Sequence, residues 1–175
     1  MPESGKTTVA MMLKKKGFSE LEMSDFIKEL MRREHIAING KNAEVFAKEL
    51  KKKFGNQIVA KLMTKRLKKT RGNIVISGVR NINEFEYFRN LLHIKPVLIA
   101  IMAPPKMRYQ RVRATRNMQM QSYKDFLLHD KRSLTRGTAR IIKSADMIIL
   151  NTGTISDLRK NVNMVINLIN KQNNN

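Results

Sequence analysis

Residues 2–8 read Pro2-Glu3-Ser4-Gly5-Lys6-Thr7-Thr8, and this stretch decides the fold of the chain. It matches the second half of the pattern G-x-x-x-x-G-K-[ST], in which a glycine-rich turn leads into a helix. The glycine lets the backbone approach a phosphate, and the amides after it point at the anion from the helix N-terminus. We therefore expect a nucleotide site in which Lys6 reaches the β- and γ-phosphates and the Thr7 hydroxyl ligates Mg²⁺. The alternative is a chance match at a helix start in a basic protein.

The first glycine of the pattern would stand before Met1, together with the buried strand that leads into such a loop. We expect the sheet to lack this first strand, either because the start codon lies too far downstream or because the gene is truncated. The strands beside the gap would then have unpaired edges, which favour aggregation.

Short apolar runs alternate with stretches of helical periodicity along the rest of the chain. The strand candidates are residues 21–23, 74–76, 97–102 and 147–150. Helices are expected over residues 7–16, 43–53, 56–69 and 83–92, in a long basic stretch at about 106–145, and after the expected N-caps Ser24 and Ser156. This order predicts a three-layer α/β/α fold of the P-loop NTPase class, with a parallel sheet. We expect one domain over residues 1–170, with a helical lid at about 106–143, and a polar tail at 171–175.

Composition limits the classes of protein that fit. The formal net charge of +21 attracts polyanions such as nucleotides, phosphorylated coenzymes or nucleic acid, although the lysine runs 14–16, 51–53 and 68–69 are more simply explained as solvated helix ends. Without cysteine the chain forms neither disulfides nor thiolate metal sites, and its three scattered histidines, at 35, 93 and 129, have no metal-ligand spacing. It has neither an apolar run of membrane-spanning length nor an apolar leader, so we expect a cytoplasmic protein with no membrane partner.

Polar side chains follow the strand candidates, at the end of the sheet where α/β proteins bind ligands. Asp25 is able to orient an acceptor hydroxyl or take its proton, unless it only caps a helix. Arg80, in Ser77-Gly78-Val79-Arg80, is able to hold an acceptor phosphate through two hydrogen bonds. Among the arginines at 108, 111, 113 and 116, Arg111 is the best candidate to close over the triphosphate as part of a lid. A second arginine set, at 132, 136 and 140, has the spacing of one helix face.

The same motifs occur in this order in dephospho-CoA kinases. Residues 145–158 resemble the A-D-x-x-I-x-N-x-G-[ST]-x-x-x-L segment of that family, and residues 24–29 and 77–88 resemble elements of a small archaeal group of dephospho-CoA kinase-like and adenylate kinase-like P-loop proteins. The resemblance covers nearly the whole chain. It implies that residues 151–153 line the adenine pocket of an ATP site. It also implies that Ser77 stands where an aspartate helps to hold Mg²⁺, which would weaken metal binding and turnover.

We therefore predict an enzyme that uses ATP and Mg²⁺ to phosphorylate a small phosphorylated acceptor, of the dephospho-CoA or nucleoside monophosphate type. The predicted catalytic residues are Lys6, Asp25, Arg80 and Arg111, and Thr7 is the predicted metal ligand. The predicted nucleotide-binding residues are Pro2, Glu3, Ser4, Gly5, Lys6, Thr7, Thr8, Asn151, Thr152 and Gly153. Two alternatives stay open: a nucleotide-responsive nucleic-acid-binding P-loop protein with weak or no kinase activity, and a protein without activity.

Overall fold

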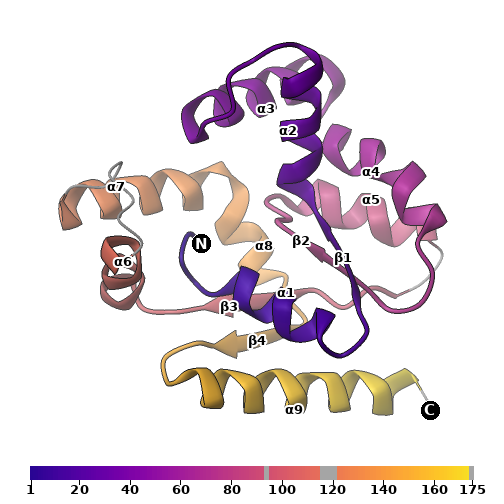
Figure 1. Cartoon of the computed structure of the whole chain (residues 1–175), viewed down its shortest axis with the longest axis vertical. Coiled ribbons are helices and arrows are strands. Elements are labelled where there is room, and N and C mark those ends of the chain that lie inside the picture. Colours follow the sequence, from indigo (N-terminus) through magenta and orange to yellow (C-terminus); the bar gives the residue numbers. More distant parts are fainter. Residues whose placement is uncertain (93–94, 115–121, 174–175) are drawn as a thin grey trace. The chain divides into compact units, whose positions relative to one another are not determined.

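The chain forms two compact units in the computed structural model, which describes residues 1–92, 95–114 and 122–173. The terminal unit consists of Met1–Met12 and Val97–Asn175, and the central unit is the continuous segment Leu13–Pro96. Helix α1 (Lys6–Lys14) begins in the first and ends in the second. Figure 1 traces the chain from the indigo N-terminus to the yellow C-terminal helix. One domain over residues 1–170 stays a prediction.

The central unit packs four helices around two parallel strands. Its elements are β1 (Ser19–Glu22), α2 (Met23–Arg33), α3 (Gly40–Phe54), α4 (Ile58–Lys69), β2 (Ile74–Ser77) and α5 (Ile82–Leu92). Strands β1 and β2 pair with Leu21 opposite Ile76. Helix α4 lies between α2 and α5 in the contacts of this unit, and its apolar face contributes Val59, Ala60, Met63 and Leu67 to the core. The helical period of those four residues puts them on one side of α4, which buries them together.

The terminal unit has the same kind of centre, two parallel strands. Its elements are β3 (Ile99–Met102), α6 (Pro105–Ala114), α7 (Tyr123–Ser133), the π-helical turn Leu134–Thr138, α8 (Ala139–Lys143), β4 (Met147–Leu150) and α9 (Ile155–Asn173). Strands β3 and β4 pair with Ile101 opposite Ile149, and α9 packs against β4 (Figure 1). Both units therefore place the carboxyl ends of neighbouring parallel strands side by side.

The predicted α/β fold with parallel strands is confirmed, and the structure corrects several details. The lid stretch is not one long helix, because Gly137 has a φ of 111° inside the π-helical turn and separates α7 from α8. Arg132 and Arg140 therefore do not share one regular helix face, and residues 115–121 of the stretch, including Arg116, lie outside the described residues. Residues 1–5 form turns before α1, and the first strand expected before Met1 stays a prediction.

The predicted N-caps were wrong at both positions. Helix α2 begins at Met23 with Glu22 as its N-cap, and the Ser24 hydroxyl instead donates to Glu22 Oε1 at 3.1 Å. At the last helix the cap is Thr154, whose hydroxyl accepts from the Asp157 amide at 3.2 Å while the Thr154 amide donates to Asp157 Oδ2 at 2.9 Å. This reciprocal pair is a capping box, and it starts α9 one residue before Ser156.

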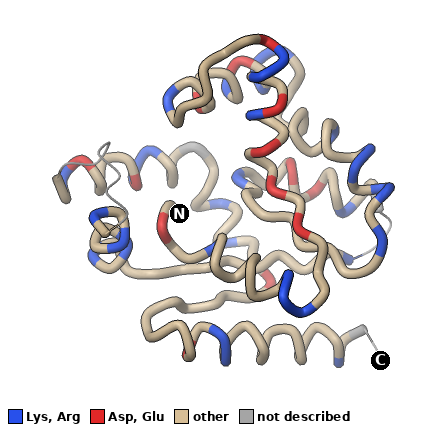
Figure 2. The backbone as a smooth tube through the Cα atoms, in the orientation of Figure 1, with Lys and Arg blue, Asp and Glu red and all other residues tan. Residues whose placement is uncertain are grey.

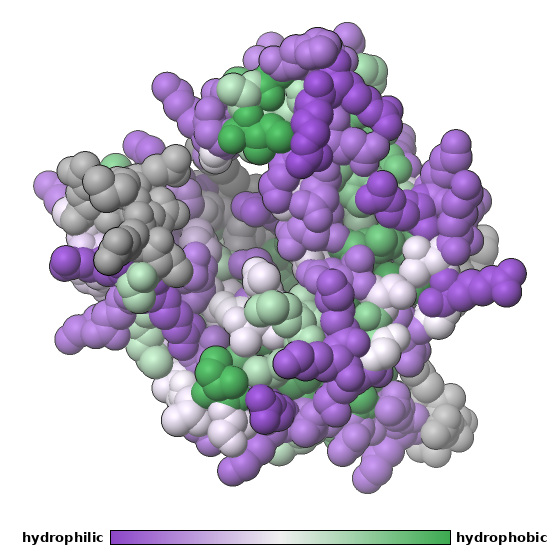
Figure 3. Space-filling view, viewed as in Figure 1, coloured by the Kyte–Doolittle hydropathy of each residue, from purple (hydrophilic) through white to green (hydrophobic). Residues whose placement is uncertain are grey.

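The surface is mainly hydrophilic in the view of Figure 3, and apolar side chains gather there in small patches. Lysines and arginines lie on helices of both units rather than in a single place (Figure 2). As predicted, the runs 51–53 and 68–69 belong to the last turns of α3 and α4, where cations complement the helix dipole. Of the helices in the described residues, none combines the length and the apolar character needed to cross a bilayer.

Candidate functional site

The loop before α1 has an unusual backbone. Glu3 has a φ of 51° and Gly5 a φ of 100°, so two residues of this short turn occupy the left-handed region. At Gly5 the space is also limited, because a Cβ there would lie inside van der Waals contact of Asn151 Nδ2. Only glycine satisfies both conditions, which explains why this residue type stands at this position.

The N-terminus of α1 provides donors that are not used inside the helix. The first amide that bonds within it is that of Val9, which donates to the Gly5 carbonyl at 2.9 Å. The amides of Thr7 and Thr8 therefore lie in the first turn, where the N–H groups of a helix have no intrahelical partner. The Thr7 side chain is exposed in this turn. Such a turn is suited to an anion, because its partial positive charge adds to the hydrogen bonds of the amides.

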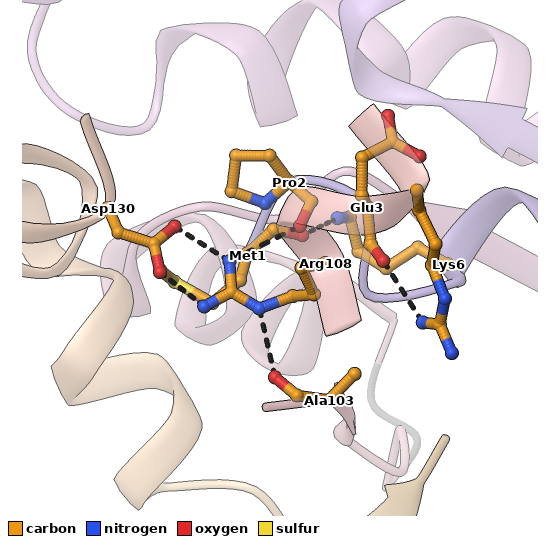
Figure 4. Close-up of polar contacts among 8 residues, drawn as sticks. Met1, Pro2, Glu3, Lys6, Ala103, Arg108 and Asp130 are labelled. Atoms are coloured by element: carbon orange, nitrogen blue, oxygen red, sulfur yellow. Dashed lines mark hydrogen bonds and ion pairs between the residues drawn. The ribbon is translucent and has the colours of Figure 1, made fainter. Parts of the chain in front are cut away.

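Each carbonyl of residues 1–4 accepts a hydrogen bond from a side chain. In order along the loop the donors are Lys6 (2.6 Å), Arg108 (3.4 Å), Arg111 (3.2 Å) and Asn151 (2.9 Å). Figure 4 shows the bonds of Lys6 and Arg108 around the first residues of the chain. Three of the four donors are cations, so the loop collects positive charge from α1 and α6.

Two arginines of α6, Arg108 and Arg111, reach the loop and are three residues apart on the helix. Arg111 also donates to the Asn151 carbonyl at 2.9 Å, and it is half-buried. Arg108 is buried, and its guanidinium is held by Asp130 of α7. Arg108 therefore supports the loop from a buried position. The third arginine of the helix, Arg113, is exposed.

Asn151 connects the end of β4 to the loop. Its amide continues the strand pairing by donating to the Met102 carbonyl at 2.7 Å, and its buried side chain donates to the Ser4 carbonyl. Sequence reasoning gave Asn151 only backbone contacts with adenine and missed this hydrogen bond across 147 positions. Thr152 and Gly153 are exposed beyond it.

The capping box of α9, formed by Thr154 and Asp157, comes directly after residues 151–153 in the chain. The Thr154 hydroxyl and then the Thr154 amide, both donating to Asp157, hold the pKa of this carboxyl below its ordinary value of 3.8. Because these hydrogen bonds stabilise the ionised form, Asp157 is a carboxylate at neutral pH.

In the central unit, polar groups gather at the carboxyl ends of β1 and β2. Ser77 Oγ lies 3.0 Å from Glu20 Oε1 and 2.8 Å from Glu22 Oε2. Sequence reasoning assigned no role to these glutamates, although the alternation Ser19-Glu20-Leu21-Glu22 puts both on one face of a strand. Carboxylate and hydroxyl oxygens are ligands of the type that Mg²⁺ prefers, but the described residues contain no cluster of three or more acidic or histidine side chains placed to hold a metal ion.

The turn after β2 is held by a buried carboxylate. Glu84 Oε2 accepts the amides of Arg80 at 3.0 Å and Asn81 at 3.3 Å, while Glu84 Oε1 pairs with Lys51 Nζ at 2.8 Å. The Arg80 side chain is exposed. The backbone around the predicted phosphate-binding arginine is thus fixed while its side chain projects from the unit.

Asp25 lies in the first turn of α2, where its exposed side chain accepts from Lys28 Nζ at 2.9 Å. The structure therefore places the predicted site residues in two groups. The loop, Arg111 and Asn151 come together in the terminal unit, while Asp25 and Arg80 belong to the central unit. Their chemical roles stay predictions.

Comparison with known proteins gives a consistent picture. A family model described as an AAA domain matches residues 1–132. UPF0200 proteins are similar over most of their length: that of Saccharolobus islandicus is 31% identical (91% of this chain and 85% of the relative covered), and that of Sulfurisphaera tokodaii is 32% identical (91% and 88%). The UPF0200 protein of Pyrococcus horikoshii is 29% identical, with 97% of this chain and 94% of that protein covered.

Solved structures show the same fold. TT1252 from Thermus thermophilus has a TM-score of 0.62 and 20% identity, with 94% of this chain and 92% of that chain covered. Shikimate kinase from Acinetobacter baumannii, solved in complex with shikimate, has a TM-score of 0.58 and 17% identity, with 98% and 90% covered. These similarities show the P-loop kinase-like α/β fold.

Proposed function

Because this chain belongs to the AAA domain family and to the UPF0200 proteins, we propose that it transfers the γ-phosphoryl group of ATP to a small phosphorylated acceptor. The acceptor is a hydroxyl compound of the dephospho-CoA or nucleoside monophosphate type. In this proposal the protein acts in the cytoplasm, with Mg²⁺ as its metal ion.

One observation supports the proposal: the left-handed loop leads directly into the N-terminus of α1, and this arrangement is suited to a polyphosphate. Gly5 is required there, the amides of Thr7 and Thr8 lie in the first helical turn, and Lys6 adds an ammonium group. An exposed hydroxyl, that of Thr7, stands in the same turn and is the side chain that we assign to magnesium. When bound, magnesium neutralises charge on the β- and γ-phosphates. The adenine end of ATP is assigned to the backbone of residues 151–153.

The remaining residues have roles in the transfer. The acceptor hydroxyl oxygen forms the new bond to the γ-phosphorus, the bond from that phosphorus to ADP breaks, and Asp25 accepts the hydroxyl proton. Arg80 holds the phosphate of the acceptor, for which its exposed side chain and fixed backbone are suited. Arg111 leaves the loop carbonyl to stabilise charge on the transferred group.

A titration of the full chain with ATP and magnesium is the first test, followed by a screen of acceptors with radiolabelled ATP. We expect saturable binding, and we expect Lys6→Met to lower the transfer rate by roughly 10²–10³-fold, as for other residues that stabilise developing charge. Lys15→Met is the matched control, because Lys15 is exposed just after the same helix and its loss removes the same charge. Absence of saturable ATP binding, or equal rates for Lys6→Met and Lys15→Met, would refute the proposal.

Nucleic-acid binding is the alternative suggested by the net charge of +21. Charge is its only support, since the described aromatic rings of α6 and α7, those of Tyr109, Tyr123 and Phe126, pack on one another rather than forming a separate platform for bases. We therefore do not propose it.

A further inference from the structure

Arg108 is a buried cation of the terminal unit with several polar contacts. Its Nε donates to the Ala103 carbonyl at 2.9 Å, and its Nη1 donates to Asp130 Oδ1 at 2.7 Å and to the Pro2 carbonyl at 3.4 Å. Nη2 donates to the other oxygen of Asp130, and the guanidinium lies over the Phe126 ring, 5.2 Å from its centroid. Figure 4 shows this fork between Asp130 and the start of the chain. Arg108 therefore connects the end of β3, helix α7 and the loop.

Burial prevents this arginine from acting on a substrate directly. Arg108 is 3% exposed and Asp130 is 5% exposed. To reach a nucleotide, Arg108 would have to leave a buried carboxylate without a partner, which is strongly destabilising. Arg111, three residues further along the helix, donates to the main-chain carbonyls of Glu3 and Asn151, and such hydrogen bonds are exchanged at a lower cost. Arg108 and Arg111 of α6 therefore have different roles.

Helix α7 determines how Arg108 is oriented. Phe126 and Asp130 are four residues apart and share a face of α7, so the ring and the carboxylate both contact the guanidinium of Arg108. A bidentate pair fixes the plane of an arginine as well as its position. Helix α7 therefore fixes the position of Arg108 Nη1, which donates to the Pro2 carbonyl from 106 positions away in the chain.

We infer that Arg108 and Asp130 are a positioning pair for the phosphate-binding loop. The pair holds the Pro2 carbonyl and thereby keeps the loop in the conformation that leaves its amides for an anion, without touching the nucleotide itself. The inference rests on the proposed function for its effect on ATP, whereas the effect on loop conformation is independent of any ligand.

The test removes the pair without leaving a buried charge. Replacing a buried ion pair by apolar residues of similar size is often neutral for stability, whereas removal of one partner is not. We expect Asp130→Leu alone to lower the melting temperature and Arg108→Met/Asp130→Leu to restore most of it. In the double variant the Val9 amide, which donates to the Gly5 carbonyl of the loop, should exchange with deuterium roughly 10- to 100-fold faster, and the Kd for ATP and magnesium should rise by a similar factor, which is the effect of losing one charged hydrogen bond.

Arg113→Met is the matched control, since it removes an exposed arginine from the same helix; it should change neither measurement. If the double variant does not fold, Arg108→Lys replaces it, because an ammonium group cannot reproduce the fork to Asp130 and also reach Pro2. Amide exchange and Kd equal to those of the unchanged protein would overturn the inference and indicate a purely structural pair. Absence of ATP binding by the unchanged protein would instead refute the proposed function. Amide exchange alone would then test whether Arg108 and Asp130 position the loop.

Discussion

Gly5→Ala tests whether the loop conformation depends on this glycine in the way the structure indicates. Two costs are expected. The φ of 100° is unfavourable for alanine by about 1–2 kcal/mol. The new methyl group would also displace the Asn151 side chain, which breaks its buried hydrogen bond to the Ser4 carbonyl and costs about 1–3 kcal/mol. The free energy of unfolding should therefore fall by about 2–5 kcal/mol in total.

Gly17→Ala separates the two costs. Gly17 has a φ of 88°, but a Cβ there would meet nothing within 4 Å, so only the backbone term applies. Urea unfolding of the two variants should differ by about 1–3 kcal/mol, with Gly5→Ala the less stable. Because Gly5→Ala and Asn151→Ala lose the same hydrogen bond, the double variant should lose less stability than the two single variants added together. Equal stabilities for Gly5→Ala and Gly17→Ala would refute the reasoning.

Three further predictions concern single side chains. Asp157→Asn should remove the stabilisation that the ionised carboxylate gives to the folded state. This contribution is fully present above the ordinary pKa of 3.8 and is lost as the pH falls through the lowered pKa of the folded state. The melting temperatures of the variant and the unchanged protein should therefore converge only at acidic pH. Glu84→Ala removes the acceptor of two amides and the partner of a lysine, so it should lower the free energy of unfolding by about 3–5 kcal/mol, whereas Glu86→Ala, which breaks a surface pair, should change it by less than about 1 kcal/mol. Asn39→Ala removes the hydrogen bond that caps α3 and should cost about 1 kcal/mol in urea unfolding; no loss of stability would contradict its role as a cap.

The local features of the fold were predictable from the sequence because their signals are local. The turn before α1 and the helix itself follow from seven neighbouring residues, and β2, β3 and β4 follow from short apolar runs. Helix caps depend on a choice between adjacent polar residues. Sequence reasoning chose Ser156, although Thr154 with Asp157 three residues later has the spacing of a capping box.

The contacts that hold the candidate site were not predictable in the same way. Asn151 reaches Ser4 and Arg108 reaches Pro2 through tertiary packing, and no pattern along the chain pairs residues so far apart. Arg108 and Arg111 have the same residue type and share a helix, so their different burial appears only when α7 is packed against α6. Glu20 and Glu22 differ from these, because strand alternation puts them on one face of β1, although the strand expected from the sequence, residues 21–23, began after Glu20.

The terminal unit is built from two separate segments, Met1–Met12 and Val97–Asn175, and this has a consequence for synthesis on the ribosome. The central unit is one uninterrupted segment that ends at Pro96, so it is translated before most of the terminal unit. The loop at the N-terminus gains its partner Asn151 only near the end of translation, and closing a loop of 147 positions costs about 4 kcal/mol of chain entropy in addition to a constant. The central unit is therefore able to fold first, and the loop before α1 stays without its partner Asn151 until the last strand of the terminal unit has been made.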